Sequence, residues 1–243
     1  MSKSKIIAMW SGPRNLSTAL MRSFAQRDDA QVWDEPFYAA YLAATGLDHP
    51  MRAEILAAGI VDPKEAARRC IACPAEKAVF YQKHMTHHML EGFPLDWMDH
   101  ATNAFLIRAP ERVLASYVRK REAVTAGEIG YRHQRELFER VADKSGSEPA
   151  VIDSDDIRQK PERALRSLCR ALEIPFDPAM LSWPAGPHSS DGVWAPHWYD
   201  AIWKSTGFAP PDTKLPKLPA DLAAIADEVR NDYELVAQHR LRI

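Results

Sequence analysis

Five short apolar runs, each followed by a helical segment, are the feature that most restricts the fold of this chain. We predict strands at residues 5–10, 30–34, 77–84, 104–108 and 149–153. Strands that alternate with helices form a parallel sheet through right-handed crossovers, with helices on both faces. The sequence therefore predicts an α/β fold, a three-layer α/β/α sandwich with a mainly parallel sheet.

Three further segments complete the chain around these strands. Alanine-rich helical segments are expected over about 37–73, a Trp- and Pro-rich stretch over about 183–219 predicts an irregular cap, and a last helix is expected over 220–238. The chain has no internal repeat, low-complexity tract or evident linker, and 243 residues are enough for one domain with a buried core. We therefore predict a single domain spanning residues 1–243.

The charge balance restricts the partners of the chain. A formal net charge of −2 argues against a surface built to cover nucleic acid or an anionic membrane, so any anion site has to be local. The first residues lack an apolar stretch of signal-peptide length, and no later segment reaches transmembrane length. The three cysteines, two of them in the pair Cys70-x-x-Cys73, are expected to be ordinary thiols. These features predict a cytoplasmic protein without nucleic-acid or membrane partners, and they leave its oligomeric state open.

The loop after the first strand has the composition of an anion-binding site. It leads into a helix, where unpaired backbone N–H groups and the positive helix end attract a phosphate. Arg14 supplies a fixed positive charge, and short polar side chains supply hydrogen-bond donors. The alternative is a plain strand-to-helix turn capped by Ser or Asn. The candidate binding residues are Gly12, Pro13, Arg14, Asn15, Leu16, Ser17 and Thr18.

The same loop argues against one large class of phosphate-binding enzymes. It lacks the GxxxxGK[ST] arrangement of nucleoside triphosphatases, including its lysine. The strand ends also offer no clear magnesium-binding carboxylate. Hydrolysis of a nucleoside triphosphate therefore loses its main support.

A second basic segment follows the fourth strand. Arg108 lies at the ligand-binding end of that strand, and Pro110 suits the first turn of the following helix. Ser116 lies one helical turn beyond Arg112, so Arg108 and Ser116 are expected to face a phosphate beside the first loop. The alternative is an ordinary helix start with a solvated basic face at 119–121.

Together, the two segments resemble the sulfotransferase family, in its bacterial branch. The resemblance spans roughly Lys5 to Pro175 and implies a P-loop NTPase-like fold with 3′-phosphoadenosine-5′-phosphosulfate as the co-substrate. It places Arg108 and Ser116 at the 3′-phosphate. At the 5′-phosphosulfate it places Arg14, Asn15, Ser17 and Thr18. Two departures are Leu16, where relatives usually carry glycine, and the lack of a late Arg-Lys-Gly loop.

Glu35 follows the second strand, and Lys83 and His84 end the third, at the same sheet edge as the phosphate loop. In some branches of the family a glutamate resembling Glu35 is the base that deprotonates the acceptor, whereas cytosolic members carry Lys-x-His. Lys83 matches that lysine, but His84 comes one residue early, so we prefer Glu35 over His84 as the base. The alternative for Glu35 is a structural acid before Pro36. Arg14 and Lys83 are expected to stabilise charge on the transferred group.

Other polar and aromatic residues are interpreted as structural. His87 and His88 suit a helix start, and the acids at 153, 155 and 156 suit a helix cap rather than a magnesium site. The tryptophans of the cap are expected mainly to pack it. We predict no metal site.

The resemblance thus implies transfer of a sulfuryl group to a hydroxyl or amine of a small-molecule acceptor, with acceptor specificity in the helical insert and the cap. Two alternatives remain open. One is a P-loop kinase of a nucleotide or small metabolite, and the other is a noncatalytic nucleotide-binding module of the same fold.

Overall fold

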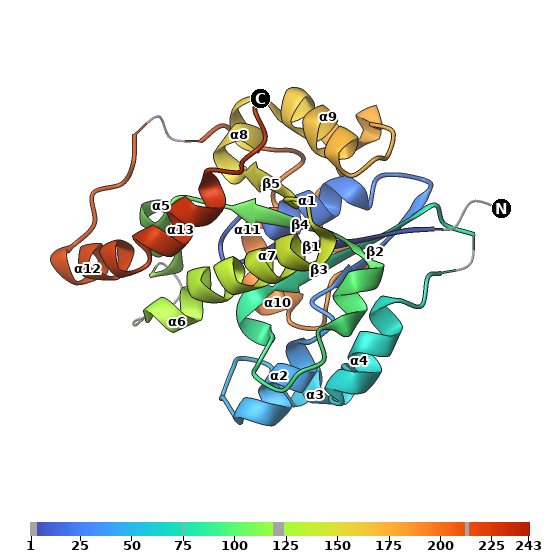
Figure 1. Cartoon of the computed structure of the whole chain (residues 1–243), viewed down its shortest axis with the longest axis horizontal. Coiled ribbons are helices and arrows are strands. Elements are labelled where there is room, and N and C mark those ends of the chain that lie inside the picture. Colours follow the sequence, from blue (N-terminus) through green and yellow to red (C-terminus); the bar gives the residue numbers. More distant parts are fainter. Residues whose placement is uncertain (1–3, 75, 119–123, 212–213) are drawn as a thin grey trace.

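A sheet of five parallel strands forms the centre of the computed structural model, which describes residues 4–74, 76–118, 124–211 and 214–243 (Figure 1). Its order is β2-β3-β1-β4-β5, and every neighbouring pair runs parallel. The predicted α/β fold is confirmed. The strands are β1 (Lys5–Ser11), β2 (Ala30–Asp34), β3 (Val79–Met85), β4 (Thr102–Ile107) and β5 (Ala150–Asp153).

Helices follow the strands much as the sequence predicts. The α-helices in the described ranges are α1 (Ser17–Phe24), α2 (Tyr38–Thr45), α3 (Arg52–Ala58), α4 (Pro63–Cys70), α5 (Pro110–Tyr117), α6 (Ala126–Ile129), α7 (Tyr131–Ser145), α8 (Ser154–Gln159), α9 (Pro161–Ala171), α10 (Ala195–Trp198), α11 (Asp200–Trp203), α12 (Ala220–Glu228) and α13 (Arg230–Ala237). Three 3-10 turns are η1 (Thr86–His88), η2 (Asp96–His100) and η3 (Pro178–Leu181).

Two expectations about helices change. The single last helix is in fact two, α12 and α13, which meet at Val229. They separate there because α12 packs on α5 and α6, whereas α13 packs on α7 and the sheet. The Trp- and Pro-rich cap contains the short helices α10 and α11 as well as irregular backbone. The basic face predicted at 119–121 lies outside the described residues.

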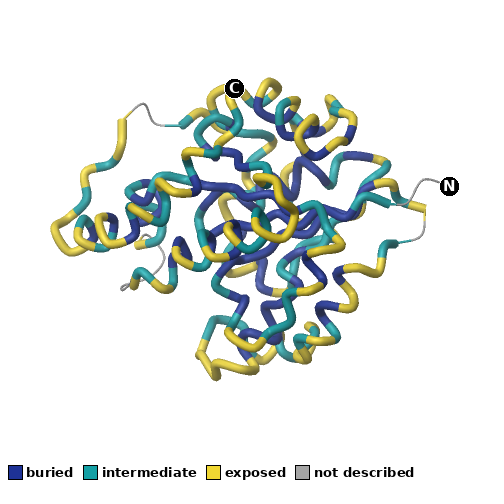
Figure 2. The backbone as a smooth tube through the Cα atoms, viewed as in Figure 1, coloured by how far each residue is buried: buried dark blue, intermediate teal, exposed yellow. Residues whose placement is uncertain are grey.

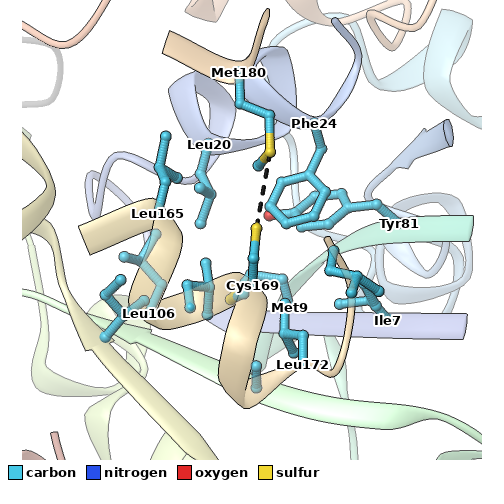
Figure 3. Close-up of a cluster of buried hydrophobic side chains, with 14 of the residues drawn as sticks. Ile7, Met9, Leu20, Phe24, Tyr81, Leu106, Leu165, Cys169, Leu172 and Met180 are labelled. Carbon is cyan, nitrogen blue, oxygen red and sulfur yellow. Dashed lines mark hydrogen bonds between the residues drawn. The ribbon is translucent and has the colours of Figure 1, made fainter. Parts of the chain in front are cut away.

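The two faces of the sheet bury different side chains, because successive residues of a strand point in opposite directions. Ile7 and Met9 of β1 pack against α1, α8 and α9, and Figure 3 shows this cluster around Leu20 and Phe24. Ala8 and Trp10, which alternate with them along β1, pack on the other face, against α4, α7, η2 and α13. Helices on both faces therefore complete the three layers.

Burial is concentrated in the sheet and on the inner sides of these helices (Figure 2). Each fully buried Leu, Ile or Phe contributes roughly 1.5–3 kcal/mol relative to an exposed one, so the two clusters hold the strand ends in place. In the described ranges, no helix combines the length and the apolar character needed to cross a membrane.

Candidate active site

A cavity of about 420 Å³ opens at the carboxyl ends of the strands. The sheet order reverses at β1, which has β3 on one side and β4 on the other, and ligands of α/β sheets bind at such points. All of the site residues predicted from the sequence line this cavity except Gly12 and His84. The cap and the helical insert also contribute to its walls.

The loop between β1 and α1 adopts a conformation that is rare for side-chain-bearing residues. Arg14 has a φ of 61° and Leu16 a φ of 74°, both in the left-handed region. Leu16 therefore keeps the conformation that a glycine would adopt, at a cost of about 1–3 kcal/mol in strain. Gly12 does not line the cavity, but a Cβ there would lie 2.5 Å from the carbonyl oxygen of Ile129, so only glycine fits.

The start of α1 leaves hydrogen-bond donors for a ligand. Leu16 occupies its N-cap and makes no side-chain capping bond, and the first turn carries no acidic residue. The first amides of a helix have no partner within the helix, and the helix dipole makes this end positive. The end of α1 is thus suited to an anion.

The two basic segments meet as the sequence predicts. Arg14 Nε donates to Ser116 Oγ at 3.1 Å, and Arg108 Nη1 donates to the carbonyl oxygen of Arg14 at 2.7 Å. Asn15 Nδ2 also reaches the carbonyl oxygen of Leu106 on β4, at 3.3 Å. The loop and the start of α5 therefore form one basic wall of the cavity.

Arg108 is a confined charge in this wall. Burial lowers its pKa, and the neighbouring Arg158 lowers it further, although the group stays protonated. Its Nε is buried and has no hydrogen-bond partner within the described ranges. Arg158 also lines the cavity, and its guanidinium donates to the carbonyl oxygens of Ala209 and Pro210. An anion placed here would balance a local excess of positive charge.

A buried charged cluster forms a second part of the site. Lys83 is 2% exposed, and its Nζ lies 2.9 Å from Asp34 Oδ1 and 2.6 Å from Glu35 Oε1. It also donates to Tyr199 Oη at 2.8 Å. Tyr199 in turn donates to Asp34 Oδ2 at 2.6 Å. We call Asp34, Glu35, Lys83 and Tyr199 the lysine cluster.

Local backbone geometry explains how two consecutive acids reach one lysine. Asp34 and Lys83 are register partners on the adjacent strands β2 and β3, so their side chains lie side by side. Glu35 follows the end of β2 with a φ of 44°, which breaks the alternation of the strand and turns its side chain back to Lys83. Its N–H is held by the carbonyl oxygen of Lys83 at 2.9 Å.

The lysine cluster contains two carboxylates and only one ammonium, so one negative charge is left unbalanced. Removal from water disfavours the ammonium of Lys83, but Asp34 and Glu35 outweigh this effect and raise its pKa well above the usual value. Burial raises the pKa of Glu35, while Lys83 opposes the shift and Asp34 adds to it. Asp34 Oδ2 has further donors in Tyr199 and the N–H of Gly192. The raised pKa of Glu35 suits a carboxylate that takes up a proton.

The structure separates the two candidate bases. Glu35 lines the cavity, whereas His84 points to the opposite face of the sheet because it is one residue from Lys83 on β3. His84 stacks on Trp10 at 4.5 Å between ring centroids, and its Nε2 pairs with Gln82 Oε1 at 3.0 Å. Burial lowers the pKa of His84 to about 3.

The residues that were assigned structural roles from the sequence differ in their outcome. His87 and His88 lie in η1 and line the cavity. Asp153 caps α8 by accepting from the N–H of Asp155, which confirms the predicted cap. Asp155 itself pairs with Arg112 at 2.6 Å.

Sequence reasoning missed Asp34 and Tyr199. Asp34 was visible as a second acid at a strand end, but its neighbour Glu35 received the functional interpretation. Tyr199 lies in the cap, 165 positions from Asp34, where no periodic pattern indicates which side chains turn inward. The cap also places Trp194 and Trp198 in the cavity wall.

The sequence matches the profile of a family described as "Sulfotransferase domain" over residues 4–229. Two similar curated proteins come from Arabidopsis thaliana. Branched-chain-amino-acid aminotransferase-like protein 2 is 42% identical over 85% of this chain, and protein 1 of the same name is 41% identical over 87%. The chain spans only 37% and 38% of the lengths of these two relatives.

Solved structures with a similar fold are sulfotransferases. A sulfotransferase domain from the curacin biosynthetic pathway is 17% identical with a TM-score of 0.56, covering 95% of this chain and 99% of that one. A sulfotransferase from Alicyclobacillus acidocaldarius is 15% identical with a TM-score of 0.54, covering 99% and 98%. Mouse sulfotransferase SULT7A1, complexed with PAP, is 13% identical with a TM-score of 0.52, covering 96% and 85%. At these identities the likeness concerns the fold.

Proposed function

This chain belongs to the sulfotransferase domain family, and on that basis we propose that it transfers a sulfuryl group from 3′-phosphoadenosine-5′-phosphosulfate to a hydroxyl or amine of a small molecule, leaving adenosine 3′,5′-bisphosphate. One observation carries the proposal. A single cavity is lined by the start of α1, by Arg14 and Arg108, and by the buried carboxylate Glu35. Such a cavity can bind an anionic sulfuryl donor next to a group that accepts a proton, as the reaction requires.

The basic wall fits the donor. In this proposal the loop residues 13–18 hold the 5′-phosphosulfate, and Arg108 and Ser116 hold the 3′-phosphate, with Arg158 as a further cation beside them. The unpartnered buried Nε of Arg108 supports an anion at this place. The PAP complex of the mouse sulfotransferase supports the same class of donor. When bound, the donor supplies a sulfuryl group already activated by its phosphate leaving group.

Glu35 is the proposed base. Its carboxylate would take the proton of the acceptor group as the acceptor oxygen or nitrogen bonds to sulfur. The raised pKa of Glu35, caused first by burial, favours proton uptake from a weakly acidic group. Positioned proton transfer typically supplies about 10²–10⁴-fold in rate, so positioning and charge stabilisation have to supply the rest.

The sequence suggested that Lys83 contacts the transferred group directly, and we propose a different role for it. Its ammonium has three N–H donors, and Asp34, Glu35 and Tyr199 accept all three. We therefore propose that Lys83 holds Glu35 in place and contributes its charge through space. Arg14 remains the residue proposed to contact the transferred group.

The acceptor is proposed to occupy the part of the cavity walled by the insert and the cap. Tyr38 and His49 come from the insert, and Trp194 and Trp198 come from the cap. These rings suit a compact apolar body with one reactive polar group, which agrees with a small-molecule acceptor.

Replacing Arg108 by alanine tests the donor site. We expect the wild-type protein to bind adenosine 3′,5′-bisphosphate in the presence of a metal chelator, because the basic wall supplies the positive charge. Arg108→Ala should weaken this binding by about 1.5–3 kcal/mol, and should affect adenosine 5′-phosphate much less. Calorimetric titration of both nucleotides measures the difference.

A matched control is Arg166→Ala, which removes an arginine exposed on α9. It should leave both affinities unchanged. Equal losses for the two nucleotides in Arg108→Ala would remove Arg108 from the 3′-phosphate site.

A further inference from the structure

His88 lies at the end of η1, and rings of the helical insert hold its side chain in a slot. Its imidazole stacks on Tyr38 with centroids 4.7 Å apart and on Tyr41 with centroids 4.8 Å apart, both from α2. The side chain is only 3% exposed. The stacked neighbours fix the plane of the ring, and with it the directions in which the ring nitrogens point.

One nitrogen of this fixed ring lacks a partner. His88 Nδ1 is buried and has no hydrogen bond within the described part of the chain. Glu35 Oε2 lies 3.9 Å away, which is beyond hydrogen-bonding distance. Burial and the neighbouring His87 and His49 lower the pKa of His88 well below its usual value, so the ring is neutral and the contact is not an ion pair. Buried nitrogens are rarely left unpaired, so His88 Nδ1 is available to an oxygen atom of a bound molecule.

The gap between the two atoms suits a single bridging oxygen. For an oxygen about 2.8 Å from each atom, the angle between the two contacts would be roughly 90°, which bends the hydrogen bonds moderately from the near-tetrahedral directions of a hydroxyl and stays within hydrogen-bonding geometry. Glu35 Oε1 is already taken by Lys83, so Oε2 is the oxygen that faces an acceptor. A carboxylate beside Nδ1 favours the tautomer with the proton on that nitrogen, so Nδ1 donates and Oε2 accepts.

We propose that His88 is a second acceptor-binding residue, and that His88 Nδ1 and Glu35 Oε2 together hold one acceptor hydroxyl. The hydroxyl oxygen accepts from Nδ1–H and donates its own proton to Oε2, which leaves a second lone pair for bonding to sulfur. This inference rests on the proposed role of Glu35 as the base. It also narrows the acceptor class, because a neutral hydroxyl has both a proton and a lone pair, whereas a protonated amine has no lone pair for Nδ1.

Binding of a hydroxyl probe tests the proposed pair of His88 Nδ1 and Glu35 Oε2 without catalysis. Phenol and anisole differ by the hydroxyl proton, and both suit a cavity lined by Tyr38 and Trp194. Each is titrated into protein with nitrogen-15-labelled histidine, and the His88 signals are assigned from the His88→Asn variant. We expect phenol to shift the Nδ1 resonance of His88 and anisole to shift it far less. Equal shifts from both probes, or no binding of phenol, would overturn the proposal.

Two substitutions separate hydrogen bonding from packing. An asparagine places an amide nitrogen near the Nδ1 position, whereas a glutamine places it near Nε2. We expect His88→Gln to raise the Kd of phenol about tenfold, and His88→Asn to remain close to wild type. Adenosine 3′,5′-bisphosphate should bind equally to both variants and to the control His100→Asn, which changes an exposed histidine. An equal loss of phenol affinity in the Asn and Gln variants would show that His88 only packs against its neighbours.

The outcome is distinguishable from failure of the proposed function. If the wild-type protein did not bind adenosine 3′,5′-bisphosphate, the donor assignment would fail, whereas the phenol titration would still decide whether His88 and Glu35 hold a hydroxyl. If the bisphosphate bound normally and phenol left the His88 Nδ1 resonance unchanged, the donor site would be supported and the role of His88 would be contradicted.

Discussion

Glu35→Gln is expected to lower the rate of sulfuryl transfer by at least about 10²-fold, with adenosine 3′,5′-bisphosphate binding nearly unchanged. The amide keeps the shape of the side chain and still accepts from Lys83, but it cannot take a proton. The substitution also removes the unbalanced negative charge of the lysine cluster and leaves the Lys83–Asp34 pair intact. The fold is therefore not penalised, and the loss reports on chemistry. Single-turnover transfer from the labelled donor measures it.

The pH dependence gives this experiment a second readout. The base must be unprotonated, so wild-type transfer should rise with pH through the pKa of Glu35, which burial raises above its usual value. That rise should disappear in Glu35→Gln. His84→Ala is the comparison variant, because His84 lies among Trp10 and Trp97 on the other face of the sheet, and it should lose less activity. Abolished transfer in His84→Ala together with normal transfer in Glu35→Gln would reverse the assignment of the base.

Lys83→Met is expected to destabilise the fold by about 3 kcal/mol or more near pH 8, because it leaves Asp34 and Glu35 buried without their ammonium partner. Without Lys83, burial and the neighbouring Asp34 hold the pKa of Glu35 in the folded state above its unfolded value. A group with a raised folded-state pKa stabilises the fold at low pH, and this stabilisation is lost as the pH rises through that pKa. The deficit of the variant should therefore be smaller at pH 5 than at pH 8.

Denaturant unfolding at the two pH values measures this effect. Lys5→Met is the matched control, since Lys5 lies on the neighbouring strand β1 and pairs with Glu173 in an exposed contact. Its stability should change little at either pH. A Lys83→Met variant no less stable than Lys5→Met would show that the lysine cluster does not act as a unit.

The sequence was sufficient to predict the sheet and the loop that leads into α1, because both leave local signals. The strands are short apolar runs, and the loop lies at a strand-to-helix junction with Arg14 in it. The contact between Arg14 and Ser116 spans 102 positions, yet it was predictable, because parallel strands bring their carboxyl ends to one edge. The parallel topology thus brings the loop with Arg14 and the segment with Ser116 together in one place.

The parts of the site that the sequence did not reveal depend on packing in the cap and the insert. Tyr199 reaches Lys83 from a Trp- and Pro-rich segment without periodicity. His88 is placed by stacking on Tyr38 and Tyr41, which no spacing rule links to it. The turn of Glu35 towards Lys83 depends on a positive φ that a non-glycine residue rarely adopts. Each is a tertiary contact or a strained conformation rather than a local preference.

The most direct test of the proposed function follows labelled sulfur from 3′-phosphoadenosine-5′-phosphosulfate in the presence of a metal chelator, with a panel of neutral hydroxyl compounds as acceptors. We expect one sulfated acceptor to form for each adenosine 3′,5′-bisphosphate released, and we expect the transfer to be lost in Glu35→Gln. Absence of transfer across the panel, or phosphoryl transfer from ATP with magnesium in its place, would contradict it.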